Sequence, residues 1–304
     1  MRMSDAQGAM GDLTAKVAAG EPLSSQDRDL LVATRDLLAL GMLADEARRR
    51  RHGDRVTFVR VARMPCRPRQ GEPSEVPPTA GEIRIDGPIE DVVQAAARIR
   101  EVLALSDGQP VSAFTLGELD RWSSENGIPL GDILRQLREA GLELVAEAEL
   151  DRLERSLEAC EAVATSGLTI ARVTMKDPPP QGVLSLFAEL RSLQSALGSL
   201  RAFAPLPRTL SALAPSTGYD DVKQVALARL LVDNVPTIQV DWSLYGPKLA
   251  QVALSFGADD VDAVSPVNDA GAEGWRRSAL EEIRRNVAAA SLVPVERNGR
   301  FELL

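Results

Sequence analysis

The chain has 304 residues, of which 44% are hydrophobic, 26% are charged and only 4% are aromatic. This length suits one α/β barrel of about 250 residues with extensions, whose core must be largely aliphatic. A net charge of −9 and an isoelectric point near 4.9 argue against nucleic-acid binding. No apolar run approaches the roughly 18 residues of a membrane span, and residues 1–20 have no apolar signal-peptide core. We therefore expect a cytoplasmic protein.

The apolar pattern and the turn signals predict helices first, and then strands that alternate with helices. Residues 21–52 have a leucine-rich helical face, and the basic run Arg48–Arg51 near their end is interpreted as a solvated helix terminus. A strand at 56–62 and a Pro- and Gly-rich loop at 65–81 follow. The further expected elements are strand 82–85, helix 89–105, strand 110–115, helices 116–125 and 129–140, strand 142–146, helix 148–164, strand 168–175, helix 183–197, strand 200–205, helix 220–233, strand 237–240, helix 247–255, strand 259–262, helix 275–290 and a β-hairpin at 292–303.

This alternation predicts the fold class. Strands joined by helices of ten or more residues form parallel βαβ units. Seven or eight such units without a GxGxxG phosphate loop favour a closed barrel over a doubly wound sheet. We predict an α/β fold of the TIM-barrel type, partial or modified, at residues 55–264. A helical extension at 1–54 precedes it, and a helix with a β-hairpin at 265–304 packs on it.

Several segments resemble one known family. Residues 56–66 form a first strand that runs into a loop with one cysteine, and residues 112–118 resemble a later strand. The segments Val225–Pro236 and Gly246–Asp262 carry the strongest similarity. Together they resemble aminofutalosine synthase, a radical S-adenosylmethionine (SAM) enzyme of the futalosine route to menaquinone. The resemblance implies a radical SAM-like barrel that works in or beside that pathway.

The chain departs from this family where the radical chemistry would take place. The family holds a [4Fe-4S] cluster on a Cys-x-x-x-Cys-x-x-Cys loop after the first strand, whereas this chain has only Cys66 there. Cys160 lies on a predicted helix and is most simply a small buried hydrophobe. Residues 67–81 are too few for a cluster loop and a crossover helix. We expect the first crossover helix to be missing, and neither the cluster nor SAM to be bound.

Functional groups of a barrel gather at the carboxyl ends of its strands. The acid/base candidates there are Glu118, Asp241 and Asp259. The other side chains expected at these ends, as candidates for binding a polar ligand, are Arg60, Arg63, Asp86, Glu147, Lys176, Arg208, Trp242 and Asp260. All of them could equally be solvated or helix-capping residues. His52 is the only histidine of the sequence, which excludes a histidine-based zinc site, and we expect no metal.

Two functions of different classes follow. The first is a catalytically degenerate barrel that binds a paralogous radical SAM menaquinone enzyme or a second copy, or retains a pathway intermediate. Loss of the crossover helix would expose Val56, Phe58, Val59, Ile83 and Ile85, which predicts an interface. The alternative is a hydrolase or lyase that acts without radicals on a futalosine-like or carboxylated aromatic compound. A polar pocket with converging carboxylates favours the enzyme, and a collapsed barrel mouth favours the binding protein. A cluster completed by cysteines of a partner chain is a third possibility.

Overall fold

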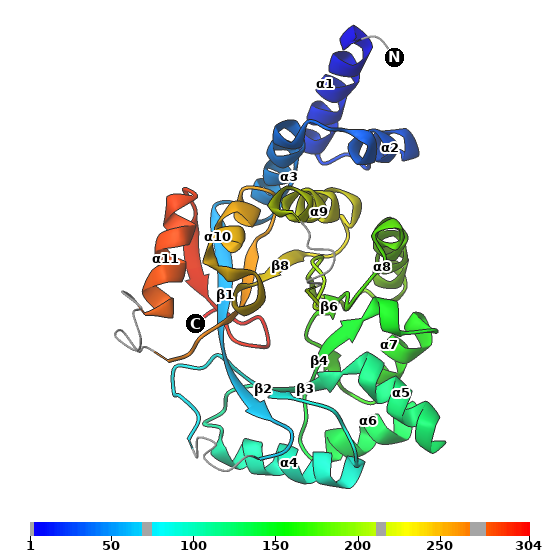
Figure 1. Ribbon diagram of the computed structural model, residues 1–304, viewed down its shortest axis with the longest axis vertical. Coiled ribbons are helices and arrows are strands. Elements are labelled where there is room, and N and C mark those ends of the chain that lie inside the picture. Colours follow the sequence, from blue (N-terminus) through cyan, green and yellow to red (C-terminus); the bar gives the residue numbers. More distant parts are fainter. Residues whose placement is uncertain (1–2, 69–74, 211–216, 268–277) are drawn as a thin grey trace.

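The computed structural model describes residues 3–68, 75–210, 217–267 and 278–304. Within them, eight parallel strands close into a barrel, helices surround it, and three helices at the amino-terminal end of the chain stand off one side (Figure 1). The strands, each paired with the next, are β1 (Arg55–Pro65), β2 (Glu82–Asp86), β3 (Val111–Thr115), β4 (Leu144–Glu149), β6 (Val173–Thr174), β7 (Ala202–Phe203), β8 (Thr237–Asp241) and β9 (Asp260–Val264). β9 pairs back with β1, so the predicted α/β barrel is confirmed.

The helices that follow the strands lie outside the barrel. They are α4 (Val92–Leu105), α5 (Leu116–Asn126), α6 (Leu130–Glu139), α7 (Ser156–Thr165), α8 (Val183–Leu197), α9 (Gly218–Leu231), α10 (Trp242–Leu254) and α11 (Ala279–Ala289). In α4, the Asp91 side chain caps the first turn by accepting the N–H of Val93, and Ala95, Ile99 and Val102 form a buried stripe. The start of the helix predicted at 275–290 lies outside the described residues, and none of the described helices is long and apolar enough to cross a membrane.

Two expected elements differ from the prediction. The strand at 168–175 is split into β5 (Thr169–Ile170), which pairs with β4, and β6. The helix at 148–164 begins only at Ser156, because β4 continues to Glu149 and residues Leu150–Arg152 form a 3-10 turn. The terminal hairpin consists of β10 (Val293–Glu296) and one antiparallel bridge between Arg297 and Leu303.

The three amino-terminal helices are α1 (Met3–Ala19), α2 (Ser25–Ala33) and α3 (Leu37–His52). The sequence predicted a helical extension at 1–54 with one apolar helical face at 21–52, and it did not predict the division into three helices. The basic run at the end of α3 is not simply solvated, as we had interpreted it. Arg48 is fully buried and donates to the carbonyl of Gly53, and Arg51 donates to the carbonyls of Val235 and Asp233. Arg48 thus caps the carboxyl end of α3, and Arg51 attaches that end to the loop between α9 and β8.

No helix lies between β1 and β2 in the described residues 66–68 and 75–81. The expected consequence, exposed flanks of these strands, is wrong: Val56, Phe58, Val59, Ile83 and Ile85 are each at most 1% exposed. For Val56 and Phe58, one reason is a long-range contact that the sequence did not reveal. β10 pairs in parallel with the first half of β1, from Arg55 to Phe58, and β2 pairs with its second half. These apolar residues are therefore not available to form the predicted interface.

The backbone of Gly257 packs closely against both α3 and α9, where the amino-terminal helices contact the barrel. Its φ is +98°, and a Cβ on it would lie 2.9 Å from the Cβ of Arg229 on α9 and 3.0 Å from that of Ala44 on α3. We predict that Gly257→Ala costs about 1–3 kcal/mol more than Gly108→Ala, because it adds overpacking to backbone strain. Gly108 is the matched control, since its φ is +79° and nothing lies within 4 Å. Urea denaturation measures both variants, and equal losses would contradict the close packing.

Candidate functional site

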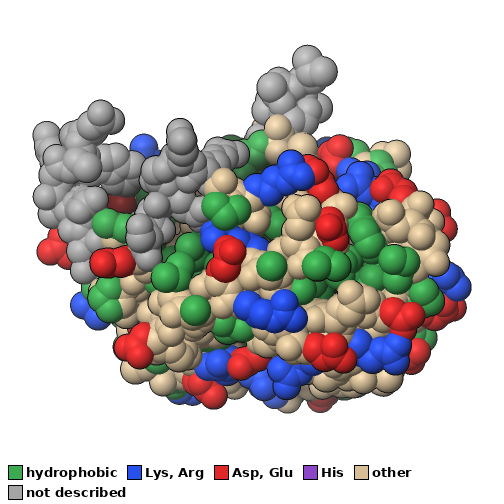
Figure 2. Space-filling model, turned by 90° about the horizontal axis from the view of Figure 1, so that it is seen from below, with side chains coloured by type: hydrophobic (Ala, Val, Ile, Leu, Met, Phe, Trp, Pro, Cys, Tyr) green, Lys and Arg blue, Asp and Glu red, His purple; other side chains and the backbone are tan. Residues whose placement is uncertain are grey.

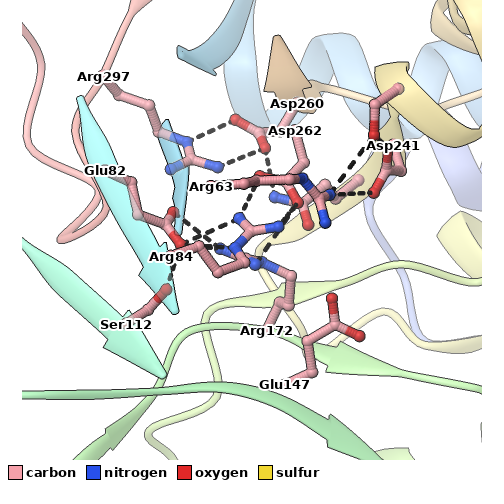
Figure 3. Close-up of polar contacts among 12 residues, drawn as sticks. Arg63, Glu82, Arg84, Ser112, Glu147, Arg172, Asp241, Asp260, Asp262 and Arg297 are labelled. Atoms are coloured by element: carbon pink, nitrogen blue, oxygen red, sulfur yellow. Dashed lines mark hydrogen bonds and ion pairs between the residues drawn. The ribbon is translucent and has the colours of Figure 1, made fainter. Parts of the chain in front are cut away.

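Charged side chains, rather than the usual branched aliphatic ones, fill the inside of the barrel (Figure 3). Arg84 of β2 reaches across to Asp262 of β9 with two parallel hydrogen bonds of 2.9 and 3.1 Å. The same guanidinium donates to Glu82 through Nε at 3.0 Å, and Arg172 donates to both oxygens of Glu82 at 2.9 and 3.0 Å. These four side chains form a network between opposite sides of the barrel, completed at Glu82 by the hydroxyl of Ser112 at 2.6 Å.

A second buried pair closes the amino end of the barrel. Arg297, just after β10, makes two hydrogen bonds of 2.7 Å to Asp260, the first residue of β9. Asp260 also accepts from Gln239 of β8 at 2.7 Å, and the guanidinium of Arg297 stacks 3.8 Å from the ring centre of Phe301. Asp260 is thus a structural group deep in the barrel.

The network holds its carboxylates ionised. Burial alone would raise the pKa of Glu82, but Arg172 and Arg84 outweigh burial and hold that pKa at about 2. Burial likewise opposes ionisation of Asp262, and the same two arginines keep its pKa well below the ordinary range. Buried charges are stabilised by such pairing, so this interior is an ionic core, in which Nε and Nη1 of Arg172 remain buried without a hydrogen-bond partner among the described residues.

Above it, at the carboxyl ends of the strands, lies a pocket of about 340 Å³. It gathers seven of the predicted site residues, namely Arg63, Asp86, Glu118, Glu147, Lys176, Arg208 and Asp241. Arg208 bridges Glu147 and Asp241 with two bonds of 3.0 Å. Arg63 donates to Asp86 at 3.1 Å. Lys176 lies 3.1 Å from Glu149, an acid that the prediction missed because it placed the end of β4 too early. The basic groups of the mouth are therefore already paired with acids.

Glu118 is different from the other acids of this pocket. It lies in the first turn of α5, where its N–H donates to the Thr115 hydroxyl at 3.2 Å. Unlike Glu147, Glu149 and Asp241, its carboxylate has no ion pair within 4.0 Å among the described residues. Burial raises the pKa of Glu118; Lys176 lowers it and Glu149 adds to the rise. A half-buried carboxyl with a raised pKa, facing a pocket, can serve as an acid or base.

Four predicted residues do not lie in this pocket. Arg60 points away from the barrel interior and pairs with Glu296 of β10 at 2.6 Å. Trp242 is buried beside a second cavity. Asp259 precedes β9 and therefore lies at the amino end of the barrel, paired with Arg229 and accepting the N–H of Ile238. Asp260 was misplaced for the same reason, because β9 begins at Asp260 and ends at Val264.

Asp241 is in the pocket, yet its contacts are structural. Its carboxylate caps α10 by accepting the N–H of Leu244 at 2.9 Å and also binds the hydroxyl of Ser243 and the guanidinium of Arg208. With Asp259 at the other end of the barrel, Glu118 is the acid/base candidate that the geometry leaves in place.

Comparison with known proteins agrees with this fold. Residues 206–304 match the family described as the CofH/MqnC C-terminal region. Aminodeoxyfutalosine synthase of Thermus thermophilus is 28% identical, over 94% of this chain and 93% of that protein. The enzyme of the same name from Streptomyces coelicolor is 27% identical, over 98% and 94%. The crystal structure of methylornithine synthase (PylB) superposes with a TM-score of 0.64 at 15% identity, covering 93% of this chain and 97% of that one.

This chain resembles aminodeoxyfutalosine synthase over nearly its whole length. The resemblance expected from the sequence is confirmed.

The thiols of the chain do not fit the [4Fe-4S] cluster that a radical SAM fold implies. Such a site requires three cysteine thiolates, and the sequence contains two cysteines. Cys66, after β1, donates its N–H to the Asp86 carbonyl at 2.7 Å, and burial raises the pKa of its thiol. Cys160 lies within the apolar core on α7, where burial raises its pKa to about 12. No group of three potential metal ligands forms among the described residues.

The ionic core predicts a pH-dependent mutational cost. At pH 7, Glu82→Ala should destabilise the fold by about 3–5 kcal/mol, because it leaves Arg84 and Arg172 buried without their acid. Since the pKa of Glu82 is depressed, its contribution is present above its ordinary value of 4.5 and is lost as the pH falls toward about 2. The difference between wild type and variant should therefore shrink over that range.

Denaturant unfolding at several pH values measures this difference. Glu125→Ala is the matched control, because Glu125 forms an exposed pair with Arg121 and should cost less than about 1 kcal/mol at any pH. A Glu82→Ala cost as small as that of the control would refute the ionic core.

Proposed function

We propose that this protein serves the futalosine route to menaquinone as a catalytically degenerate radical SAM-like barrel, which binds a pathway intermediate without radical chemistry. The relatives that cover nearly the whole chain are called aminodeoxyfutalosine synthase, and their name supports the pathway. The parallel barrel is the fold expected if the chain shares its origin with these relatives.

The observation that carries the proposal is the single thiol after β1. A cluster that activates SAM needs three thiolates on one short loop, and the turn after β2, Asp86–Pro88, is tied to β1 by Arg63 and by the N–H of Cys66. The sequence of the loop between β1 and β2 has no second cysteine or histidine that could replace the missing donors.

The mouth pocket determines what kind of intermediate could bind. It is small and polar, and its arginines and its lysine are shared with neighbouring acids. A polar ligand with both donors and acceptors can hydrogen-bond to these ion pairs without leaving a charge unpaired. An apolar ligand would instead remove water from the charged groups and give them no hydrogen bond in return.

A complex with a paralogous radical SAM enzyme, or a second copy, remains part of the proposal but has less support. The apolar strand flanks that motivated it are buried. The face shown in Figure 2 has acidic and basic side chains interspersed with apolar ones, and not gathered by sign. Of the two binding roles, retention of an intermediate at the mouth is therefore the one that the geometry favours, whereas the converging carboxylates of the mouth support the second candidate below.

The second candidate is a hydrolase or lyase that uses Glu118. Its support is specific: a partly buried carboxyl with a raised pKa faces the mouth pocket, and Lys176 and Glu149 are near enough to influence that pKa. A carboxyl with a raised pKa holds a proton to higher pH than an ordinary glutamate and can donate it to a leaving oxygen or nitrogen.

We predict that the protein takes up no [4Fe-4S] cluster and does not bind SAM with micromolar affinity. Anaerobic reconstitution with iron and sulfide, followed by iron analysis, absorption spectroscopy and calorimetry with SAM, measures both. The Thermus thermophilus relative, treated in parallel, is the positive control for the procedure. About four irons per chain, with the absorption of a [4Fe-4S] centre, would refute the absence of radical machinery.

We also predict that aminodeoxyfutalosine binds at the mouth and is recovered unchanged. Arg208→Ala, which opens the Glu147–Asp241 bridge, should weaken binding by about tenfold or more. Calorimetry measures the affinity, and chromatography of the ligand after long incubation detects turnover. Turnover that Glu118→Gln abolishes would instead establish the enzyme, and absence of binding would refute the intermediate-binding role.

A further inference from the structure

The barrel opens along one seam, between β1 and β9. β1 pairs with β9 only as far as Arg60, opposite Val264, but continues along β2 to Pro65. Beyond Arg60, a cavity of about 710 Å³ lies beside β1. It is bordered by the start of α10, by residues 75–77, by Ala263 of β9 and by residues 265–267 after β9. This volume is typical of a small-molecule site.

A bulge in β9 creates the opening. Between the paired positions Phe58↔Val261 and Arg60↔Val264, β9 has one residue more than β1. Ala263 lies within this bulge with φ +57°, a left-handed conformation that is unfavourable for alanine, and it lines the cavity. Bulges of this kind bend one strand away from its neighbour and are frequent beside functional sites.

The exposed edge of β1 presents a main-chain acceptor and donor to the cavity. The carbonyl of Arg60 accepts from Gly81, and the N–H of Cys66 donates to Asp86, so the even-numbered residues of this stretch bond toward β2. Successive residues of a strand point their main-chain groups to opposite sides. The carbonyl of Val61 and the N–H of Arg63 therefore face the cavity, side by side, where β9 no longer provides partners.

This edge suits one amide group and not a peptide strand. Pro65, the next residue with the same orientation, has no N–H, so the edge offers a single acceptor–donor pair. A peptide that added itself as a strand would need a longer run of such pairs. A flat ring with a lactam or amide edge needs only one acceptor–donor pair.

The walls and the charges define the rest of the ligand. The cavity is lined largely by apolar side chains, among them Met64, Val76, Trp242, Pro247 and Pro266. Among the described residues that line the cavity, the cation is Arg63, which is already paired with Asp86 at 3.1 Å and lies 3.8 Å from Asp241. An anionic ligand would therefore find no unpaired cation among these lining residues, and burying it there would be unfavourable.

We propose that this seam cavity binds a neutral, flat aromatic amide or lactam, whose ring lies against the apolar walls and whose amide edge pairs with the Val61 carbonyl and the Arg63 N–H. The site does not depend on the proposed role of the mouth pocket: Arg63 and Ser243 border both cavities, but the lactam contacts main-chain groups of β1, whereas the mouth presents the Arg63 guanidinium.

The probe that tests the proposal is 1(2H)-isoquinolinone, a bicyclic lactam. Two matched compounds isolate its features: the N-methyl derivative lacks the donor, and 2-naphthoate is an anion of similar size. The sequence has three tryptophans, so labelling with ¹⁵N-indole tryptophan gives few signals, and Trp242→Phe assigns that of Trp242. The lactam should shift this signal with a sub-millimolar Kd, about tenfold tighter than either matched compound.

A pair of variants tests the backbone contact. Arg63→Pro removes both the N–H and the guanidinium, whereas Arg63→Ala removes the guanidinium alone. An unpaired edge position tolerates proline, so both variants should fold, which circular dichroism checks. The lactam should bind Arg63→Pro at least about fivefold more weakly than Arg63→Ala.

Several outcomes would overturn the proposal. These are no change in the Trp242 signal at millimolar lactam, equal affinity for the lactam and its N-methyl derivative, tighter binding of the naphthoate, or equal affinity of the two Arg63 variants. If Arg63→Pro does not fold, the comparison of the three compounds on the unaltered protein still decides the matter.

Discussion

The rest of the structure depends on the ion pairs that cross the inside of the barrel. Arg84 connects Glu82 on its own strand with Asp262 on β9, and Arg172 reaches Glu82 from the far side. Desolvation of these charges is costly, and it is offset where opposite charges meet in good geometry, as both carboxylates do here. The strands must therefore keep one register, because a shift by one residue would turn these side chains outward. A barrel filled with leucine and valine would restrict the register of its strands less, because apolar side chains need no specific partner.

Because the ionic core fills the interior, the mouth pocket and the seam cavity, both near the strand ends, are the binding sites proposed above. The mouth pocket is an upward continuation of the ionic core, with Arg208 joining Glu147 to Asp241 above Arg84 and Asp262. The seam cavity is its chemical opposite, apolar and bounded by main-chain edges. The first selects polar ligands through pairing and the second selects flat apolar ones through shape, so a ligand suited to one is poorly suited to the other.

Much of this could be predicted from local patterns. The alternation of apolar and polar residues in Glu82-Ile-Arg-Ile-Asp86 puts Glu82, Arg84 and Asp86 on one face of a strand, and together with the buried strand it could have indicated an ionic interior. Other features depend on long-range contacts. The first half of β1, up to Phe58, is covered along one edge by β10, which comes from the other end of the chain, and no local signal predicts this pairing. Asp259 and Asp260 were assigned to the wrong end of their strand: the strand predicted at 259–262 begins with them, as β9 begins at Asp260, so they belong to the amino end of the barrel.

Arg63 is the residue at which the two cavities meet. Its guanidinium lines the mouth, where it pairs with Asp86 and approaches Asp241, and its main chain forms the exposed edge of the seam. Ser243 of α10 also borders both. The bulge at Ala263, which bends β9 away from β1, therefore gives one strand two separate functions: its inward side chains complete an ionic mouth, and its free edge faces an apolar cavity. A fully closed barrel would provide only the first, because β9 would then occupy the main-chain groups of Val61 and Arg63.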